Sequence, residues 1–149
     1  MLPSLAGCHY EPWGTELERP MVGRFSVVLV KEGLEEFTIT IAAEADRSYL
    51  ECYEIAFPQR IVASMQLPFA FRNRQWRTAR GAYRHDASLF VIRDSPWLPA
   101  LRESAAGTID SRSIVHYAIY GSGVCVDVVT WKAPHIHRVV PRQNMILSE

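Results

Sequence analysis

The stretch Ser88-Leu89-Phe90-Val91-Ile92-Arg93-Asp94-Ser95-Pro96-Trp97 carries the clearest structural signals in the chain. Its first five residues form an apolar run of strand length, which predicts a β-strand. The Asp-Ser-Pro that follows is typical of a helix start. A small polar side chain there can accept hydrogen bonds from free backbone N–H groups, and proline at the first helical position needs no donor. We therefore expect a short helix after Pro96, with Trp97, Leu98 and Leu101 on its apolar face.

The sequence after this helix predicts a β-hairpin. A polar loop at residues 103–112 leads into two β-rich runs, residues 114–120 and 124–131, which Gly121-Ser122-Gly123 separates. No helical pattern follows these glycines, so they indicate a hairpin turn rather than a phosphate-binding loop. We expect residues 88–131 to form the core, with these side chains largely buried: Phe90, Ile92, Trp97, Leu101, Tyr117 and Ile119.

Residues 24–31 and 36–42 predict a second hairpin around Glu32-Gly33. In its second strand apolar residues alternate with Thr38 and Thr40, so one face should pack on a core and the other should face water. Residues 47–57 fit either a strand or a helix, and their aromatic and β-branched content favours a strand. Further short extended segments are expected at residues 60–66 and 136–140.

These patterns favour an α+β fold for a single domain of residues 1–149. Strands outnumber helices, and no repeated strand–helix–strand pattern argues for a parallel sheet. We expect one mainly antiparallel sheet that curls toward a barrel or splits in two, with one or two short helices. An all-β barrel is the alternative. Residues 1–20, which contain three prolines and two glycines, should form an irregular N-terminal arm, and residues 141–149 a loose C-terminus.

The composition is that of a folded globular protein. Of its 149 residues 48% are apolar and 21% are charged. The longest apolar runs are far shorter than the roughly 20 residues that span a bilayer, and the first residues lack the basic and apolar regions of a secretory signal. Three scattered cysteines do not suggest a disulfide framework. We therefore expect a cytoplasmic protein with reduced thiols, no membrane contact and no cofactor.

Charge is divided unevenly along the chain. Residues 1–59 contain four basic and ten acidic residues, residues 60–85 contain six arginines and no acid, and the remainder is balanced. The division predicts either a charged binding surface or two regions that lie against each other, within one chain or across a dimer. A net charge of zero favours the second interpretation. The candidate partner-binding residues are Arg72, Arg74, Trp76, Arg77, Arg80 and Arg84.

His116 and Asp127 lie on opposite arms of the hairpin predicted at residues 114–131. Pairing Tyr120 with Val124 would place His116 opposite Val128 and turn Asp127 to the other face. A shift of one residue would bring histidine and aspartate together as an acid–base pair. An ordinary polar pair is the favoured alternative. His85 and Asp86, adjacent in sequence, are a second candidate pair of the same kind.

His135 and His137 would share one face of an extended segment, and Cys8-His9 could complete a zinc site with them. The spacing matches no common zinc pattern, so surface histidines are the favoured interpretation and no metal is expected.

The leading functional hypothesis is a non-enzymatic binding module that recognises a protein partner or a second copy through the arginine and aromatic surface. One alternative is a small hydrolase or isomerase that uses a histidine–aspartate pair. Another is single-stranded nucleic-acid binding through residues 60–84. The lack of any recognisable nucleic-acid-binding motif makes this last hypothesis the less favoured one.

Overall fold

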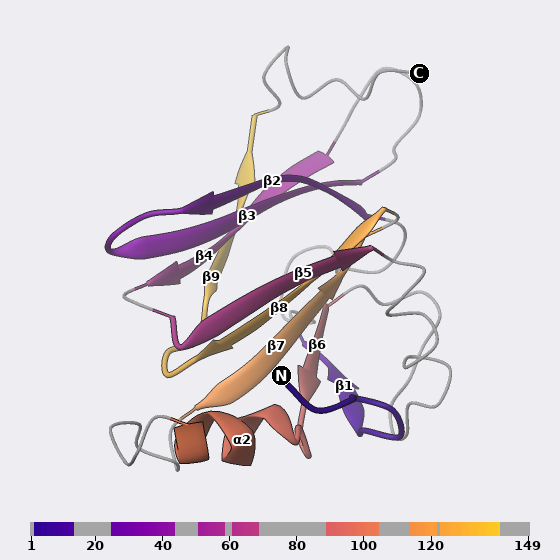
Figure 1. Cartoon of the computed structure of the whole chain (residues 1–149). Helices are drawn as coiled ribbons and strands as arrows, with labels where there is room; N and C mark the ends of the chain where they lie inside the picture. The colour runs from indigo at the N-terminus through magenta and orange to yellow at the C-terminus, as the bar shows by residue number, and fades with distance from the viewer. Residues whose placement is uncertain are drawn as a thin grey trace.

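The computed structural model describes residues 2–13, 25–43, 51–58, 61–68, 89–104, 114–121 and 123–140. These residues form two antiparallel sheets and one helix (Figure 1). The five-stranded sheet has the order β1-β6-β7-β8-β5, and the four-stranded sheet has the order β2-β3-β4-β9. The elements are β1 (Tyr10–Pro12), β2 (Phe25–Glu32), β3 (Glu36–Ala43), β4 (Glu51–Pro58), β5 (Ala63–Pro68), β6 (Leu89–Ile92), α2 (Trp97–Ser104), β7 (Val115–Tyr120), β8 (Val124–Thr130) and β9 (His135–Val139).

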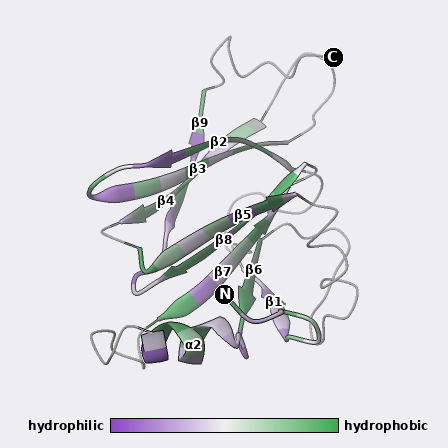
Figure 2. Ribbon diagram, in the orientation of Figure 1, coloured by the Kyte–Doolittle hydropathy of each residue, from purple (hydrophilic) through white to green (hydrophobic). Residues whose placement is uncertain are grey.

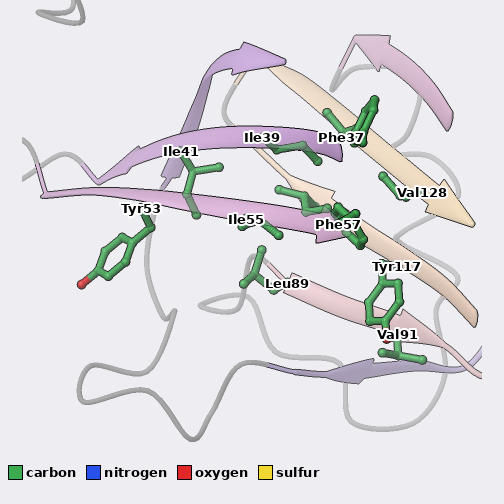
Figure 3. Close-up of a cluster of buried hydrophobic side chains, with 12 residues drawn as sticks. Phe37, Ile39, Ile41, Tyr53, Ile55, Phe57, Leu89, Val91, Tyr117 and Val128 are labelled. Atoms are coloured by element: carbon green, nitrogen blue, oxygen red, sulfur yellow. The ribbon is translucent and has the colours of Figure 1, made fainter. Parts of the chain in front are cut away.

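The main core lies between the two sheets. Alternating residues of β3 and β4 point toward alternating residues of β6, β7 and β8, as Figure 3 shows. Aromatic rings join the layers: the centroids of Phe57 and Tyr117 lie 5.5 Å apart in an edge-to-face arrangement. The buried members of this cluster are Phe37, Ile39, Ile41, Tyr53, Ile55, Phe57, Leu89, Val91, Tyr117, Ile119, Val126 and Val128.

A second apolar layer covers the opposite face of the five-stranded sheet. There α2 and most of residues 2–13, which we call the docked arm, pack against β6, β7 and β8, while Trp13 at the end of the arm packs against the main core. Because both faces of the sheet are covered, all four residues of β6 are buried, and Figure 2 shows β6 and β8 as mainly hydrophobic. The central strands therefore have nearly continuous apolar sequences rather than alternating apolar and polar residues.

The mainly antiparallel architecture and the short helix after Pro96 confirm the sequence-based expectations. The barrel that we considered is wrong, because the two sheets do not close on each other. The ambiguous segment is a strand at β4, where it pairs along its whole length with β3. The docked arm is not wholly irregular, since β1 pairs with β6 as an edge strand.

Two expectations about burial are wrong in part. Thr40 and Ala42 lie on the face of β3 opposite the main core, yet they are 3% and 0% exposed, so this face is not open to water at those positions. Leu101 is only half-buried: it packs against the apolar layer, but Trp97 is the one residue of α2 that is fully buried. The other five predicted core side chains are buried.

The β7–β8 hairpin has a register one residue away from the predicted pairing. Tyr120 lies opposite Cys125, and the Gly121 N–H donates to the Val124 carbonyl across 3.0 Å. A Cβ atom at Gly121 would lie 2.8 Å from that carbonyl oxygen and 3.0 Å from the backbone nitrogen of Val27 on β2. Only glycine therefore allows the turn to approach the facing sheet this closely.

Within the described part of the chain, no helix combines the length and the apolar character needed to cross a bilayer.

Candidate functional site

The candidate site joins three side chains from three separate elements. Ser95 lies between β6 and α2, His116 is on β7, and Asp127 is on β8. The observed register places His116 opposite Val129 and Asp127 opposite Ala118, so the two residues are diagonal neighbours on one face. The predicted pairing of Tyr120 with Val124 placed these residues on opposite faces and is wrong by one residue. The observed shift brings the weak candidate pair His116 and Asp127 together as diagonal neighbours, not directly opposite each other.

Hydrogen bonds connect the three side chains into a chain, which we call the relay. Asp127 Oδ1 lies 2.8 Å from His116 Nε2, and Ser95 Oγ lies 2.6 Å from His116 Nδ1. A carboxylate can only accept, so Nε2 carries the proton that it donates to Asp127. In a neutral imidazole this leaves Nδ1 as an acceptor, and the Ser95 hydroxyl donates to it.

Ser95 also caps α2, as the sequence predicts. Its Oγ accepts a hydrogen bond from the backbone N–H of Trp97 across 3.2 Å, and the Leu98 N–H donates to the Ser95 carbonyl. The hydroxyl therefore accepts one hydrogen bond and donates another. This double use fixes the start of the helix directly beside the imidazole of His116.

Trp97 covers the relay. Its ring stacks on the imidazole of His116 with centroids 4.5 Å apart and an interplanar angle of 24°. Its Nε1–H donates to the carbonyl of Pro3 across 2.7 Å, which connects the cover to the docked arm. Ser95 is 4% exposed, and His116 and Asp127 are 0% exposed, so the relay is closed to solvent in this conformation.

The docked arm is attached along its length to β6, the residues that follow β6, and β7. Tyr10 packs edge-to-face on Phe90, with centroids 5.7 Å apart, and accepts a hydrogen bond from the Tyr120 hydroxyl across 3.0 Å. Glu11 forms an ion pair with Arg93. Two further hydrogen bonds join the His9 backbone N–H to Asp94 Oδ1, and the Arg93 N–H to the His9 carbonyl.

The relay contains the groups of a nucleophilic serine site, in which a histidine takes the serine proton and an aspartate orients the histidine. The nitrogens are exchanged relative to serine proteases, where aspartate binds Nδ1 and serine binds Nε2. The same hydrogen bonds also join buried polar groups of β7, β8 and the start of α2, which favours a single packing arrangement of these elements. The hydrogen-bond geometry of the relay is thus compatible with nucleophilic catalysis by serine, and its burial is compatible with a structural role.

The structure separates the residues that were weighed as weak zinc candidates. His135 and His137 lie on β9 of the four-stranded sheet, where His137 Nε2 is 3.4 Å from Glu54 Oε1. Cys8 is buried in the layer on the far side of the five-stranded sheet. Among the residues that the structure describes, no group of three or more histidine, cysteine or acidic side chains could hold a metal ion.

The remaining predicted site residues, His85 and Asp86 together with the partner-binding set, lie outside the described residues. That set comprises Arg72, Arg74, Trp76, Arg77, Arg80 and Arg84.

Sequence reasoning missed Ser95 as the third member of the relay, because its capping signal already explained it. It also did not predict that the Trp97 ring stacks on His116 and covers the relay.

Two groups outside the relay have perturbed acidities. Burial raises the pKa of the Cys52 thiol. Burial also raises the pKa of Tyr117, against a smaller opposing effect of the Arg93 guanidinium. Both groups therefore hold their protons more strongly in the folded chain than in water.

Comparison with protein-family models, with curated proteins and with solved structures found no match to this chain.

Proposed function

We propose that this chain is a binding module that self-associates by exchanging its docked arm between two copies. One observation carries the proposal: the arm makes the kinds of contact by which proteins bind extended peptides. It adds a short antiparallel strand to β6, and it buries the side chains of Leu5, Cys8 and Tyr10 in the layer beside that strand. Main-chain pairing at a sheet edge combined with pockets for side chains is a common mode of peptide recognition.

The surface that receives the arm is built from β6, the residues just after it, α2 and β7. It offers an edge strand for pairing, the rings of Phe90 and Tyr120 around Tyr10, and the guanidinium of Arg93 for Glu11. A second copy carries the same surface and the same arm. Exchange would therefore reuse an interface that is already complementary, which is why swapping of an element is an accessible route to dimers.

Exchange competes with docking of the arm on its own chain. A tethered segment has an effective concentration in the millimolar range, so the closed monomer should dominate in dilute solution. Dimers should increase with protein concentration and whenever docking in the same chain is weakened. This proposal assigns self-association to the docked arm, whereas the sequence analysis favoured the arginine segment of residues 72–84 as the contact surface.

A charge exchange between Glu11 and Arg93 tests the proposal. Glu11→Arg alone and Arg93→Glu alone each place like charges together when the arm docks on its own chain. In a mixture of the two variants, both exchanged contacts pair opposite charges. We expect the mixture to contain several-fold more dimer, by size-exclusion chromatography with light scattering, than either variant alone at the same total concentration.

The double variant Glu11→Arg/Arg93→Glu is the matched control, because it restores the attraction within one chain and should behave like the unmodified protein. An exposed ion pair contributes only about 0.2–1 kcal/mol, so the comparison depends on the reversal from repulsion to attraction. If mixing leaves the dimer fraction unchanged, arm exchange is refuted. Dimers that form in every sample but dissociate in salt would instead indicate a contact made by charged surfaces such as the arginine segment.

A further inference from the structure

We infer that Ser95 is a latent nucleophile that attacks small carboxylic esters when residues 2–6 move away from Trp97. This activity is separate from arm exchange and rests on the geometry of the relay. Three observations support it: the direction of the hydrogen bonds, the placement of the serine, and the exposure of most of residues 2–6, the segment that bonds to Trp97.

The hydrogen bonds run in the direction that a nucleophilic serine requires. Asp127 accepts from Nε2 of His116, so in the neutral imidazole Nδ1 accepts the Ser95 proton across 2.6 Å. The serine hydroxyl therefore already points its proton at a base, and the carboxylate holds that base in one tautomer. The backbone N–H of Trp97 donates to Oγ across 3.2 Å and holds the serine oxygen at the start of α2.

Residues 2–6, which bond to Trp97 through the Pro3 carbonyl, form a short segment that we call the clip. Gly7 has a φ of +74°, and the Cys8 N–H donates to the Leu5 carbonyl across 3.2 Å, so the chain reverses direction between β1 and the clip. Within the clip only Leu5 is fully buried, while Ser4 and Ala6 are exposed or half-exposed. The partly buried Leu2 also packs on the apolar layer, but the other three residues of the clip are exposed, and segments with few buried side chains open locally without global unfolding.

The reaction would follow ordinary acyl transfer. Ser95 Oγ forms a bond to the ester carbonyl carbon as its proton moves to Nδ1 of His116, and the same proton then leaves with the alkoxide when the ester bond breaks. Water attacks the acyl-serine in the second half, giving up one proton to Nδ1, which returns it to Oγ as the carboxylic acid is released. No oxidant, reductant or metal is needed.

A fluorophosphonate probe followed by peptide mass spectrometry tests the inference on the full chain. The probe should form an Oγ–phosphorus bond at Ser95, with loss of fluoride, and the adduct should form at least tenfold faster in Leu5→Ala than in the unmodified protein. The adduct should disappear in Ser95→Ala and persist in Ser104→Ala, which removes an exposed serine at the other end of α2.

Two additional variants separate chemistry from loss of structure. Trp97→Phe keeps an aromatic ring over His116 but removes the bond to Pro3, so it should accelerate labelling without removing the buried leucine. Asp127→Asn should lower kcat for p-nitrophenyl acetate and leave KM nearly unchanged, because the carboxylate orients the base and does not touch the ester.

The inference is overturned if Leu5→Ala and Trp97→Phe both retain the circular dichroism of the folded chain and neither gains an adduct at Ser95. That result would make the relay purely structural. It would not affect the proposed arm exchange, which is measured by the mixing of charge variants. Conversely, if Ser95 is labelled in samples that remain monomeric after mixing of the charge variants, the inference about Ser95 is supported and arm exchange is refuted.

Discussion

The strongest quantitative prediction concerns the bond between His116 and Asp127. Both side chains are fully buried, and their contact of 2.8 Å lies in a layer that is otherwise mainly apolar. His116→Leu removes a hydrogen-bond donor to a buried carboxylate oxygen, and Asp127→Val removes the acceptor of a buried N–H. Each change should therefore lower the free energy of unfolding by about 1–3 kcal/mol, the usual cost of leaving a buried polar group unsatisfied.

The double variant His116→Leu/Asp127→Val should cost less than the sum of the two single changes. It leaves neither half of the pair behind, and two apolar side chains of similar size can pack in the same layer. Ser95 loses its acceptor but keeps its bond from the Trp97 N–H. We expect a coupling free energy of about 1–3 kcal/mol, within the range found for residues in direct contact.

Urea unfolding followed by tryptophan fluorescence and by circular dichroism would measure all four proteins of this cycle. In a chain of this length 1 kcal/mol corresponds to roughly 2–4 °C in melting temperature, so a thermal scan gives a second readout. Ser104→Ala is a control for an exposed side chain and should change stability by less than about 0.5 kcal/mol. Additivity of the two single effects within about 0.5 kcal/mol would refute the direct coupling that the geometry implies.

Two further predictions concern the turn and the alkaline range. Gly121→Ala should destabilise the chain by about 1–3 kcal/mol because its Cβ would collide with backbone atoms, whereas Gly123→Ala, with open space around it, should be nearly neutral in the same urea assay. Since burial raises the pKa of Cys52 and of Tyr117, the folded chain binds these protons more tightly, so stability is full below the ordinary thiol value of 9.0 and declines as the pH rises above it. A Cys52→Ala chain should lose less stability between pH 8 and pH 10.5 than the unmodified chain, and equal losses would contradict the thiol contribution.

Local signals in the sequence were sufficient to predict most of the strands and the helix α2. The apolar run, the small polar cap and the proline before Trp97 predict the β6–α2 junction because each acts within a few residues. The two hairpins follow from alternation and glycine turns in the same way. By contrast, the alternation in β3 predicts a water-facing side that Thr40 and Ala42 do not have, since their burial depends on contacts that no local pattern records.

The candidate site was harder to predict, because it depends on a register and on an assembly of distant segments. The identity of the turn residues did not decide whether Tyr120 pairs with Val124 or with Cys125, and that single step determines which face Asp127 occupies. The third member, Ser95, comes from a helix cap 21 residues before His116. Its contact requires the helix to lie on β7, which is a consequence of packing rather than of spacing.

The doubly covered sheet explains why such a relay exists at all. In a sheet with one face in water, a histidine and an aspartate on that face need no internal partners. Here α2 and the docked arm cover the second face, so both groups must find hydrogen-bond partners within the protein. The Ser95 hydroxyl supplies one of them at the end of α2, and Trp97 closes the site while it bonds to the arm through Pro3. Weakening the contact between Trp97 and the arm should therefore expose the relay before the rest of the arm detaches. Exposure of Ser95 and exchange of the arm can then be measured separately, by labelling and by dimer formation.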